Sequence, residues 1–577
     1  MKKFVLELTP LNQNDSIYET LKLGDWNREK ADQQSIEVEY HWNDREKLKK
    51  DYDFIFILFE KYLSELSDSL NKSHKTDYPL EYWRMVIGPW LYYFISILFD
   101  RYESIRVASA KYDIQYAELP IYNSDDWIPN DYIDFYEKYY SDEWNYFLYS
   151  EIIRNINLVS FEESSFTLSS ENKNIKVRRI SFLKKLLFLL TKLTRNFPKK
   201  VLFVEVDIPQ KFLYKILYKL KSFSFSYFLR KRVITKSIDK GLREDFFRPK
   251  GRKTEFENLL DLLIPKNIPS VHLESYEKAK QQAKAIFPDK IKLIITSNAY
   301  FSNEHFKIWA AEKKIKHSNL WVLVHGGHHG TALFNGPGEL TENIANRFYS
   351  WGWGKYNLPS SKLSLLKNKK IPKSGTDILF IPYEISKYSN HIDSSPIAQS
   401  FNGCLAMHFD FFQELKKNNL DSKVLIRLKS GAVHRNLEKE YREATHIDRY
   451  VYSDKENLFK SIERSELVIV TYDSTVFLES LTLNKPTCLF IRKDFWEMSK
   501  ESEPYFKEFK SYGILHYNEK SLIEHITKWD GNYEEWWQSI QVQKIRKAFL
   551  EKFGLSSNDW SEDWYNEIYG YLKKYEN

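Results

Sequence analysis

The chain has 577 residues, of which 42% are hydrophobic and 29% charged, and its formal net charge is +7. This balance allows a sizeable core, and 18 Gly with 18 Pro are too few for a collagen-like, linker-rich or disordered protein. The small excess of positive charge argues against a dedicated nucleic-acid binder and suits an anionic substrate or an anionic membrane surface. Two cysteines, Cys404 and Cys488, offer neither a disulfide framework nor a zinc cluster and predict a reducing, cytoplasmic compartment.

The first third of the chain is predicted to be rich in helices. Residues 1–8 indicate a first strand rather than a signal peptide, because Glu7 interrupts the only apolar run there. Apolar residues recur at helical spacing in the segments 44–70, 82–110 and 133–156. The longest apolar stretch, 85–99, contains Pro89 and is shorter than the ~20 residues that cross a bilayer, so it predicts a buried, bent helix.

A basic amphipathic stretch at 183–195 leaves two interpretations open. An ordinary surface helix with one face in the core is the favoured one. The alternative is peripheral contact with the cytosolic face of the inner membrane, since basic amphipathic helices bind anionic lipid.

From about residue 200 the pattern changes to short apolar runs that alternate with helical segments. The runs lie at 201–206, 292–296, 321–324, 377–381, 424–428, 467–470 and 486–491. Continuous short apolar runs between helices are typical of parallel strands that are buried on both faces. The polar stretch 356–375, with its prolines and glycine, indicates a linker.

We therefore predict an α/β protein with two doubly wound domains and a cleft between them. The N-terminal domain spans 1–355 with helical insertions, and the second domain spans 376–530. A helical tail, 531–577, is expected to pack back on the N-terminal domain. Ligands of such folds bind at the carboxyl ends of the strands.

The first candidate site follows the run 321–324, which leads directly into His325 and the glycine- and histidine-rich segment His325–Gly330. Glycines allow a tight turn and close approach to a ligand, and exposed backbone N–H groups hold phosphate. A histidine transfers protons near neutral pH. A metal site and a plain glycine turn are the alternatives, although no matching group of ligands follows at a familiar spacing.

The second candidate site is the start of the helix that follows the run 467–470. Asp473 precedes Ser474 and Thr475, whose hydroxyls and free helix N–H groups form an anion site. Glu479, one turn further along, is placed to accept hydrogen bonds from ribose hydroxyls. An ordinary capping motif has the same pattern.

Basic and polar residues follow three other strands. Arg427 and Lys429 at the end of the run 424–428 are expected on one side of the strand, where they would neutralise a phosphate or carboxylate; solvated charge is the alternative. Tyr383 and Glu384 follow the run 377–381 in a loop of the kind that touches ligands. Asn298 follows the run 292–296 and either shapes the cleft or caps the next helix.

The segment 468–487 resembles the donor site of GT-B glycosyltransferases. It is most similar to capsule Kdo transferases, polysialyltransferase-like enzymes and CDP-glycerol glycerophosphotransferases. The whole chain resembles bacterial O-antigen and surface-polysaccharide transferases in the stretches 82–90, 100–101, 296–298, 325–330 and 347–353. In those relatives Gln precedes the histidine, whereas this chain has Val324, so the role of that side chain does not transfer.

The resemblance implies a GT-B fold of two Rossmann-like domains, with the donor in 376–530 and the acceptor on the side of 1–355. It implies no metal and no cofactor beyond the nucleotide-sugar substrate. By position, the donor motif matches Asp473, Ser474, Thr475 and Glu479, and the histidine–glycine element matches His325 as base or phosphate ligand. The other residues at strand ends are divided between the two substrates. Those predicted to bind the donor are Gly326, Gly327, Tyr383, Glu384, Arg427 and Lys429. Those predicted on the acceptor side are Asn298, His328 and His329.

The sequence thus predicts a cytoplasmic, metal-independent glycosyltransferase. A CMP-activated acidic sugar is the first expectation for the donor, and the acceptor is expected to be a surface polysaccharide, a glycan or a lipid-linked glycan. Two alternatives remain: a CDP-glycerol or polyol phosphotransferase with a similar donor segment, and a non-catalytic scaffold for polysaccharide assembly.

Overall fold

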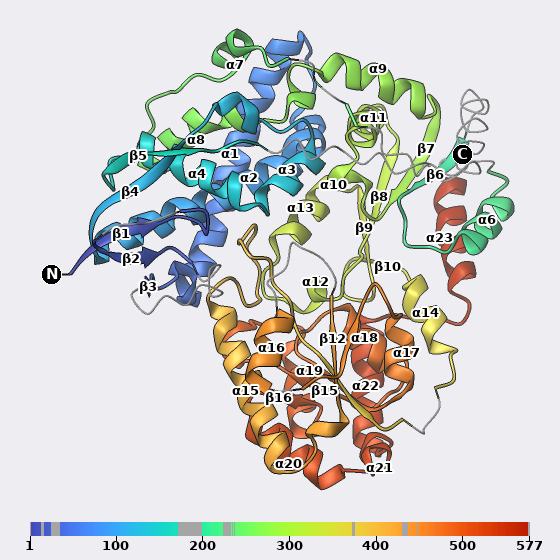
Figure 1. Cartoon of the computed structure of the whole chain (residues 1–577). Helices are drawn as coiled ribbons and strands as arrows, with labels where there is room; N and C mark the ends of the chain where they lie inside the picture. The colour runs from blue at the N-terminus through green and yellow to red at the C-terminus, as the bar shows by residue number, and fades with distance from the viewer. Residues whose placement is uncertain are drawn as a thin grey trace.

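Three parallel β-sheets organise the chain (Figure 1). The computed structural model describes residues 2–12, 17–24, 35–170, 199–222, 232–233, 235, 237–371, 375–429, 437–445 and 447–574. The amphipathic stretch 183–195 lies outside these residues. None of the helices that the structure describes is both long enough and apolar enough to cross a bilayer.

The first sheet lies at the N-terminus and was not predicted beyond its first strand. Its order is β3-β2-β1-β4-β5, and its strands are β1 (Lys3–Glu7), β2 (Glu19–Lys22), β3 (Ser35–Glu37), β4 (Asp113–Ile121) and β5 (Phe161–Thr167). β2 and β3 are only four and three residues long, and β5 is polar and mostly exposed. Such strands leave no apolar run for sequence reasoning to find.

Two long helices, α1 (Arg45–His74) and α2 (Leu80–Lys111), pack beside this sheet. α2 is buried along most of its length and contains Pro89, as the apolar stretch predicted. The helix expected over 133–156 is instead divided into α3 (Tyr132–Tyr139) and α4 (Asp142–Asn155). The break occurs because the Ser141 side chain accepts a hydrogen bond from the Trp144 N–H and starts a new helix.

The second sheet has the sequential order β10-β9-β8-β7-β6. Its strands are β6 (Lys199–Val204), β7 (Ile291–Thr296), β8 (Asn319–Leu323), β9 (Arg347–Ser350) and β10 (Tyr356–Asn357). Right-handed crossovers between sequential strands put most of the connecting helices on one face, and α6 (Gln210–Lys219) is the exception. That face is covered by α9 (Tyr276–Ile286), α11 (Glu304–Ile315) and α13 (Gly336–Ile344).

Two other helices cover the opposite face of the second sheet. Val201, Leu293 and Trp321, which alternate with residues of the first face, pack against α6 (Gln210–Lys219) and the C-terminal helix α23 (Trp560–Lys574). This sheet therefore differs from the doubly wound sheet that we expected. The last helix of the chain supplies the second layer.

The third sheet, β13-β12-β11-β14-β15-β16, is doubly wound. Its strands are β11 (Asp377–Ile381), β12 (Val424–Leu428), β13 (Tyr450–Tyr452), β14 (Ser465–Val470), β15 (Thr487–Phe490) and β16 (Leu515–His516). The strand order reverses between β11 and β14, which is where folds of this kind bind ligands. The helices around this sheet include α15 (Ser400–Lys417), α16 (Leu437–Thr445), α17 (Leu458–Glu463), α18 (Thr475–Thr482), α19 (Glu503–Ser511) and α20 (Glu519–Trp529).

The C-terminal tail is shared between the two lobes. α21 (Tyr533–Trp537) and α22 (Ile540–Phe553) belong to the core of the C-terminal sheet through Trp537, Ile545 and Phe549. Only α23 crosses to the N-terminal lobe, so the expectation that the whole tail does so was too broad. The segment 356–375 is also more than a linker, because it contains β10 and α14 (Ser361–Lys367).

The two lobes face each other (Figure 1), and residues of both line a cavity between them, in the place where the cleft was predicted. On one side, the loop after β11 docks on the N-terminal lobe, where the Ser389 carbonyl accepts a hydrogen bond from Arg101. The Lys387 ammonium pairs with Asp142 in the same region. On the other side, β10, α14 and α23 connect the lobes.

The remaining N-terminal helices are α7 (Lys240–Phe246), α8 (Glu255–Asn267), α10 (Ala299–Ser302) and α12 (His328–Thr331). α10 and α12 are single turns that follow β7 and β8 directly, so they place Asn298 and the segment His325–Gly330 at the cleft.

Candidate active site

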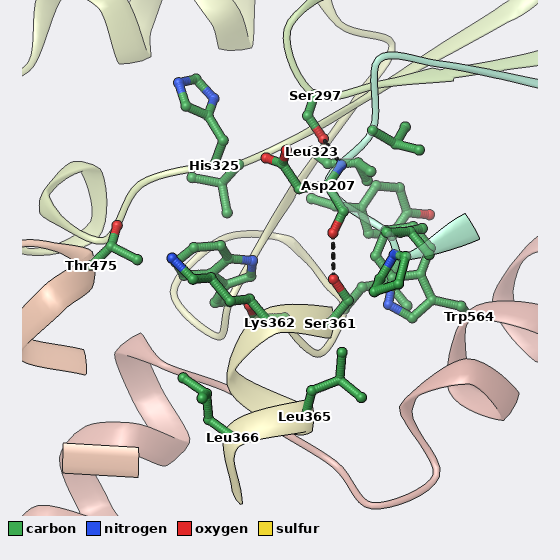
Figure 2. Close-up of a pocket in the computed structure, with 18 of the residues that line it drawn as sticks. Asp207, Ser297, Leu323, His325, Ser361, Lys362, Leu365, Leu366, Thr475 and Trp564 are labelled. Atoms are coloured by element: carbon green, nitrogen blue, oxygen red, sulfur yellow. Dashed lines mark hydrogen bonds between the residues drawn. The ribbon is translucent and has the colours of Figure 1, made fainter. Parts of the chain in front are cut away.

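His325 lies between two cavities in the cleft. One cavity of about 690 Å³ and a second of about 580 Å³ both include Val324 and His325 in their walls. Figure 2 shows the first cavity, with His325 and Thr475 on one side and Asp207, Ser297 and Lys362 nearby. His325 thus forms part of both walls, and in Figure 2 its ring points away from Asp207 and Lys362.

The glycine turn after β8 contacts the start of α18 in the other lobe. The Gly327 N–H donates a hydrogen bond to the Thr475 Oγ1 atom at 3.4 Å, although the two residues are 148 positions apart. A Cβ atom at Gly327 would lie 2.6 Å from the Leu478 side chain, so only glycine fits this approach without displacement. The two best sequence candidates thus meet, because both follow strands whose carboxyl ends face the cleft.

The start of α18 offers hydrogen-bond donors to a ligand. Ser474 is the N-cap residue, and its hydroxyl makes no capping bond. Thr475 lines the first cavity and Ser474 the second. Free N–H groups in a first helical turn attract anions, and the helix dipole strengthens that attraction.

The charge state of His325 is influenced by the protein around it. Although part of the side chain is exposed, partial desolvation in the cleft lowers the pKa of the imidazole from 6.5, and the carboxylate of Asp207 acts in the opposite direction. A neutral imidazole has one free lone pair, so His325 can accept a proton at neutral pH.

The wall of the second cavity contains the buried Asp473 and the half-buried His328, whose two ring nitrogens are buried. Burial raises the pKa of Asp473 to about 6, against the opposing effects of His328 and of a hydrogen bond with Thr331. Asp473 Oδ2 and both ring nitrogens of His328 have no hydrogen-bond partner among the described residues. Buried polar atoms without partners are uncommon, and in a cavity wall they indicate a polar ligand.

The second cavity also holds most of the other predicted residues. The Tyr383 N–H donates to Thr471 Oγ1 at 2.7 Å, and its hydroxyl lies 3.2 Å from Ser395 Oγ. The predicted residues in this wall are Asn298, His325, Gly326, His328, His329, Tyr383, Lys429, Asp473 and Ser474. Donor-side and acceptor-side candidates are therefore brought together in one space.

Besides Gly327, three predicted residues line neither cavity. Arg427 donates to Ser461 Oγ at 2.9 Å and to the Glu456 carbonyl at 2.8 Å, inside the C-terminal domain. The sequence placed Arg427 and Lys429 on one side of a strand, but β12 ends at Leu428, so strand alternation does not extend to Lys429. The expectation that Arg427 faces a ligand is not met.

The other two, Glu384 and Glu479, bond to residues that line the cavities. Glu384 accepts a hydrogen bond from the Lys429 backbone N–H and so fixes the loop after β12. Glu479 is buried and pairs with Lys362 at 2.5 Å, and Lys362 lines the first cavity. In this structure the Glu479 carboxylate thus forms an ion pair with a lysine of the cavity wall.

Sequence reasoning missed the residues that the loop after β11 brings to the second cavity. His391 lies 3.3 Å from Asp393 Oδ2, and Ser395 Oγ donates to Asp393 Oδ1 at 2.5 Å. Burial alone would raise the pKa of Asp393, but the hydrogen bond and charge of His391 hold it well below its usual value. This loop has no apolar run or glycine pattern, so nothing in the sequence singled it out.

The family model of the LIC12162 transferases matches residues 5–568. The chain belongs to the LIC12162 family of transferases. No curated protein matches the sequence of this family member.

Solved structures share only a distant likeness with this LIC12162 transferase. S. aureus MnaA with UDP is 11% identical over 65% of this chain and 97% of its own, with a TM-score of 0.36. The trehalose 6-phosphate synthase of Burkholderia multivorans is 10% identical over 65% and 97%, with a TM-score of 0.35. Acinetobacter baumannii MurG is 10% identical over 65% and 100%, with a TM-score of 0.32. With TM-scores this low, the description of the fold rests on the sheets themselves.

Proposed function

We propose that this transferase moves a sugar from a nucleotide-activated donor to a hydroxyl group of a glycan or lipid-linked glycan. The contact between the glycine turn at Gly327 and the start of α18 at Ser474 and Thr475 carries the proposal. It combines free helix N–H groups and hydroxyls with a neutral imidazole, which are the parts that sugar transfer needs on its two substrates.

The start of α18 would hold the donor phosphate. Ser474, Thr475 and the free N–H groups of the first turn would stabilise the negative charge that develops on the leaving nucleotide. Lys429 adds positive charge to the second cavity, whereas the charge of Lys362 in the first cavity is offset by its ion pair with Glu479. These fixed dipoles and cations support a mechanism that needs no metal ion.

His325 would act as the general base. Its neutral imidazole takes the proton of the acceptor hydroxyl while the acceptor oxygen bonds to the anomeric carbon of the sugar. The bond between that carbon and the donor phosphate oxygen breaks, and the nucleotide leaves with the electron pair. Asp473 and His328, with their unpartnered atoms, would bind hydroxyl groups of one of the sugars.

A CMP-linked acidic sugar is the first donor to test. Of the two basic side chains expected for its carboxylate, Lys429 lines the second cavity, whereas Arg427 bonds within the C-terminal domain. The experiment therefore includes neutral donors as well.

The test is thermal unfolding of the full chain with CMP, UDP and GDP, followed by nucleotide release from the matching nucleotide sugars and from CDP-glycerol. Stabilisation by one nucleotide and turnover of its sugar support the proposal. Turnover of CDP-glycerol alone would make the protein a phosphotransferase, and no effect of any nucleotide would favour the scaffold. A Ser474→Ala, Thr475→Val variant should lose the stabilisation. Thr482→Val is the matched control, because that hydroxyl bonds to the Leu478 carbonyl within the same helix.

A further inference from the structure

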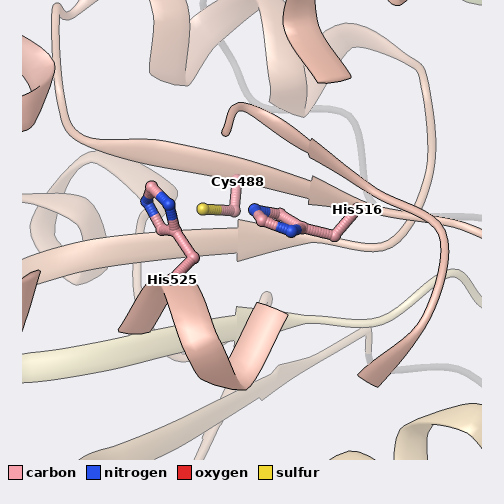
Figure 3. A group of neighbouring side chains, drawn as sticks. All are labelled: Cys488, His516 and His525. Atoms are coloured by element: carbon pink, nitrogen blue, oxygen red, sulfur yellow. The ribbon is translucent and has the colours of Figure 1, made fainter. Parts of the chain in front are cut away.

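A thiol and two imidazoles meet at the edge of the C-terminal sheet, outside both cavities (Figure 3). Cys488 lies on β15, His516 at the end of β16 and His525 on α20. One potential ligand atom from each residue lies within 4.8 Å of the other two. The three residues come from separate elements, so the fold itself assembles the group.

Local geometry holds the three side chains together. β15 and β16 pair in parallel with Phe490 opposite His516, which brings His516 next to the strand of Cys488. Gly513, with φ of +76°, makes the turn before β16, and a Cβ atom there would lie 2.7 Å from the His525 ring. A side chain at position 513 would therefore push His525 away from the other two.

The Cys488 thiol donates a weak hydrogen bond to the Gly513 carbonyl at 3.7 Å, which a metal ion would replace. His525 Nε2 is buried and has no hydrogen-bond partner among the described residues. His516 Nε2 lies 3.0 Å from the Gly513 carbonyl, and Nδ1 lies 2.8 Å from Ser521 Oγ. A carbonyl only accepts, so Nε2 carries the hydrogen in this arrangement.

The Ser521 hydroxyl permits the opposite tautomer as well. A hydroxyl can donate to Nδ1 or accept from it, so His516 can carry its hydrogen on Nδ1. The Nε2 lone pair then becomes available to a metal when the ring turns away from the Gly513 carbonyl and gives up that hydrogen bond. A partner on the outer nitrogen is also what orients histidine ligands in metal sites.

We propose that Cys488, His516 and His525 bind one divalent cation of the zinc class. Zinc prefers sulfur and nitrogen ligands at about 2.3 and 2.0 Å in a tetrahedral arrangement, which sets the ligand atoms about 3.3–3.6 Å apart. The present spacing, up to 4.8 Å, requires a contraction of about 1 Å by side-chain rotation. Magnesium and calcium are disfavoured because the group contains no oxygen ligand.

Binding forms a bond between the Cys488 sulfur and the metal and releases one proton from the thiol. Protons compete with the metal for the thiolate, so binding should weaken as the pH falls. A bound ion would tie β15 and β16 to α20 and stabilise this edge of the domain.

The experiment uses the chelator-treated full chain titrated with Co²⁺ and then Zn²⁺. We expect one equivalent of Co²⁺ to produce thiolate charge-transfer and tetrahedral visible absorption bands, which Zn²⁺ removes, and Zn²⁺ to raise the unfolding midpoint. Cys488→Ser should remove the charge-transfer band, and His525→Ala should weaken binding. Cys404→Ser is the matched control, because Cys404 is the other buried free cysteine and lies on α15.

Absence of Co²⁺ bands and of a Zn²⁺ effect in the wild-type chain would overturn the proposal and leave a hydrogen-bonded core group. The same conclusion would follow if Cys488→Ser bound Co²⁺ with an unchanged spectrum. The wild-type titration decides the matter even where a variant fails to fold. Nucleotide stabilisation is measured separately, so failure here would not count against the proposed sugar transfer.

Discussion

Asp473 is a carboxyl group whose charge is costly in the folded protein. Its pKa of about 6 exceeds the ordinary value of 3.8, because burial disfavours the ionised form. The folded chain therefore binds this proton more tightly than the unfolded chain, so stability falls as the pH rises from about 4 through 6. At neutral pH the buried charge costs on the order of 3 kcal/mol.

Asp473→Asn should remove that pH-dependent cost. We expect the variant to gain thermal stability relative to the wild type at pH 8 and to gain much less at pH 4.5, while nucleotide-sugar turnover decreases. Unfolding midpoints at the two pH values measure the difference. Asp410→Asn, at an exposed position, controls for the change of charge. An equal shift of the Asp473 variant at both pH values would contradict the argument.

His325 has the opposite relation to pH, because partial desolvation lowers its pKa from 6.5 and keeps the base active in mildly acidic solution. The acidic limb of kcat/KM should therefore lie below pH 6.5. His325→Ala should lower kcat/KM by about 10²–10⁴-fold while nucleotide affinity stays nearly unchanged. Kinetics from pH 5 to 9 and nucleotide titrations test both statements. Retention of full activity would exclude His325 as the base.

Among the elements, apolar strands were predictable and short or polar ones were not. β11 and β12 coincide with predicted runs because their residues are buried on both faces. β16 has only two residues and β5 is mostly exposed, so neither contains a recognisable run. The start of α18 was predictable for the same reason as these buried strands, because it directly follows an apolar run. His391 and Asp393 were missed because only the folded loop after β11 carries them to the cavity.

The packing of α23 on the second sheet could not be predicted from the sequence, because the strands of that sheet lie far away in the chain. Ile568 is fully buried there, beside Trp321 and Tyr571. Ile568→Ala should lower the free energy of unfolding by about 2–5 kcal/mol, the usual cost of such a cavity. Asn566→Ala, exposed on the same helix, should change it by less than about 0.5 kcal/mol. Urea unfolding compares the two, and similar stabilities would show that α23 does not cover the sheet.

At the scale of the whole molecule, one ion pair connects the lobes beside the second cavity. Arg45, the first residue of α1, donates to Glu497 from Nε at 2.6 Å and from Nη2 at 2.8 Å. Its Nη2 atom also donates to the Ser395 carbonyl at 3.2 Å. Ser395 and Trp496, next to Glu497, line the second cavity, so this pair holds one wall of the cavity against the other lobe.

A double-mutant cycle with Arg45→Gln and Glu497→Gln should give a coupling energy of about 1–2 kcal/mol, because the pair is bidentate and half-buried. Each single variant should also weaken binding of the nucleotide identified by the donor panel, since the cavity wall loses its support. Arg106 and Glu103 form the same bidentate geometry within α2, so Arg106→Gln is the control that leaves nucleotide affinity unchanged. If the nucleotide affinity of Arg45→Gln equalled that of Arg106→Gln, the contact between the lobes would not shape the site. The loop after β11 alone would then have to maintain the second cavity.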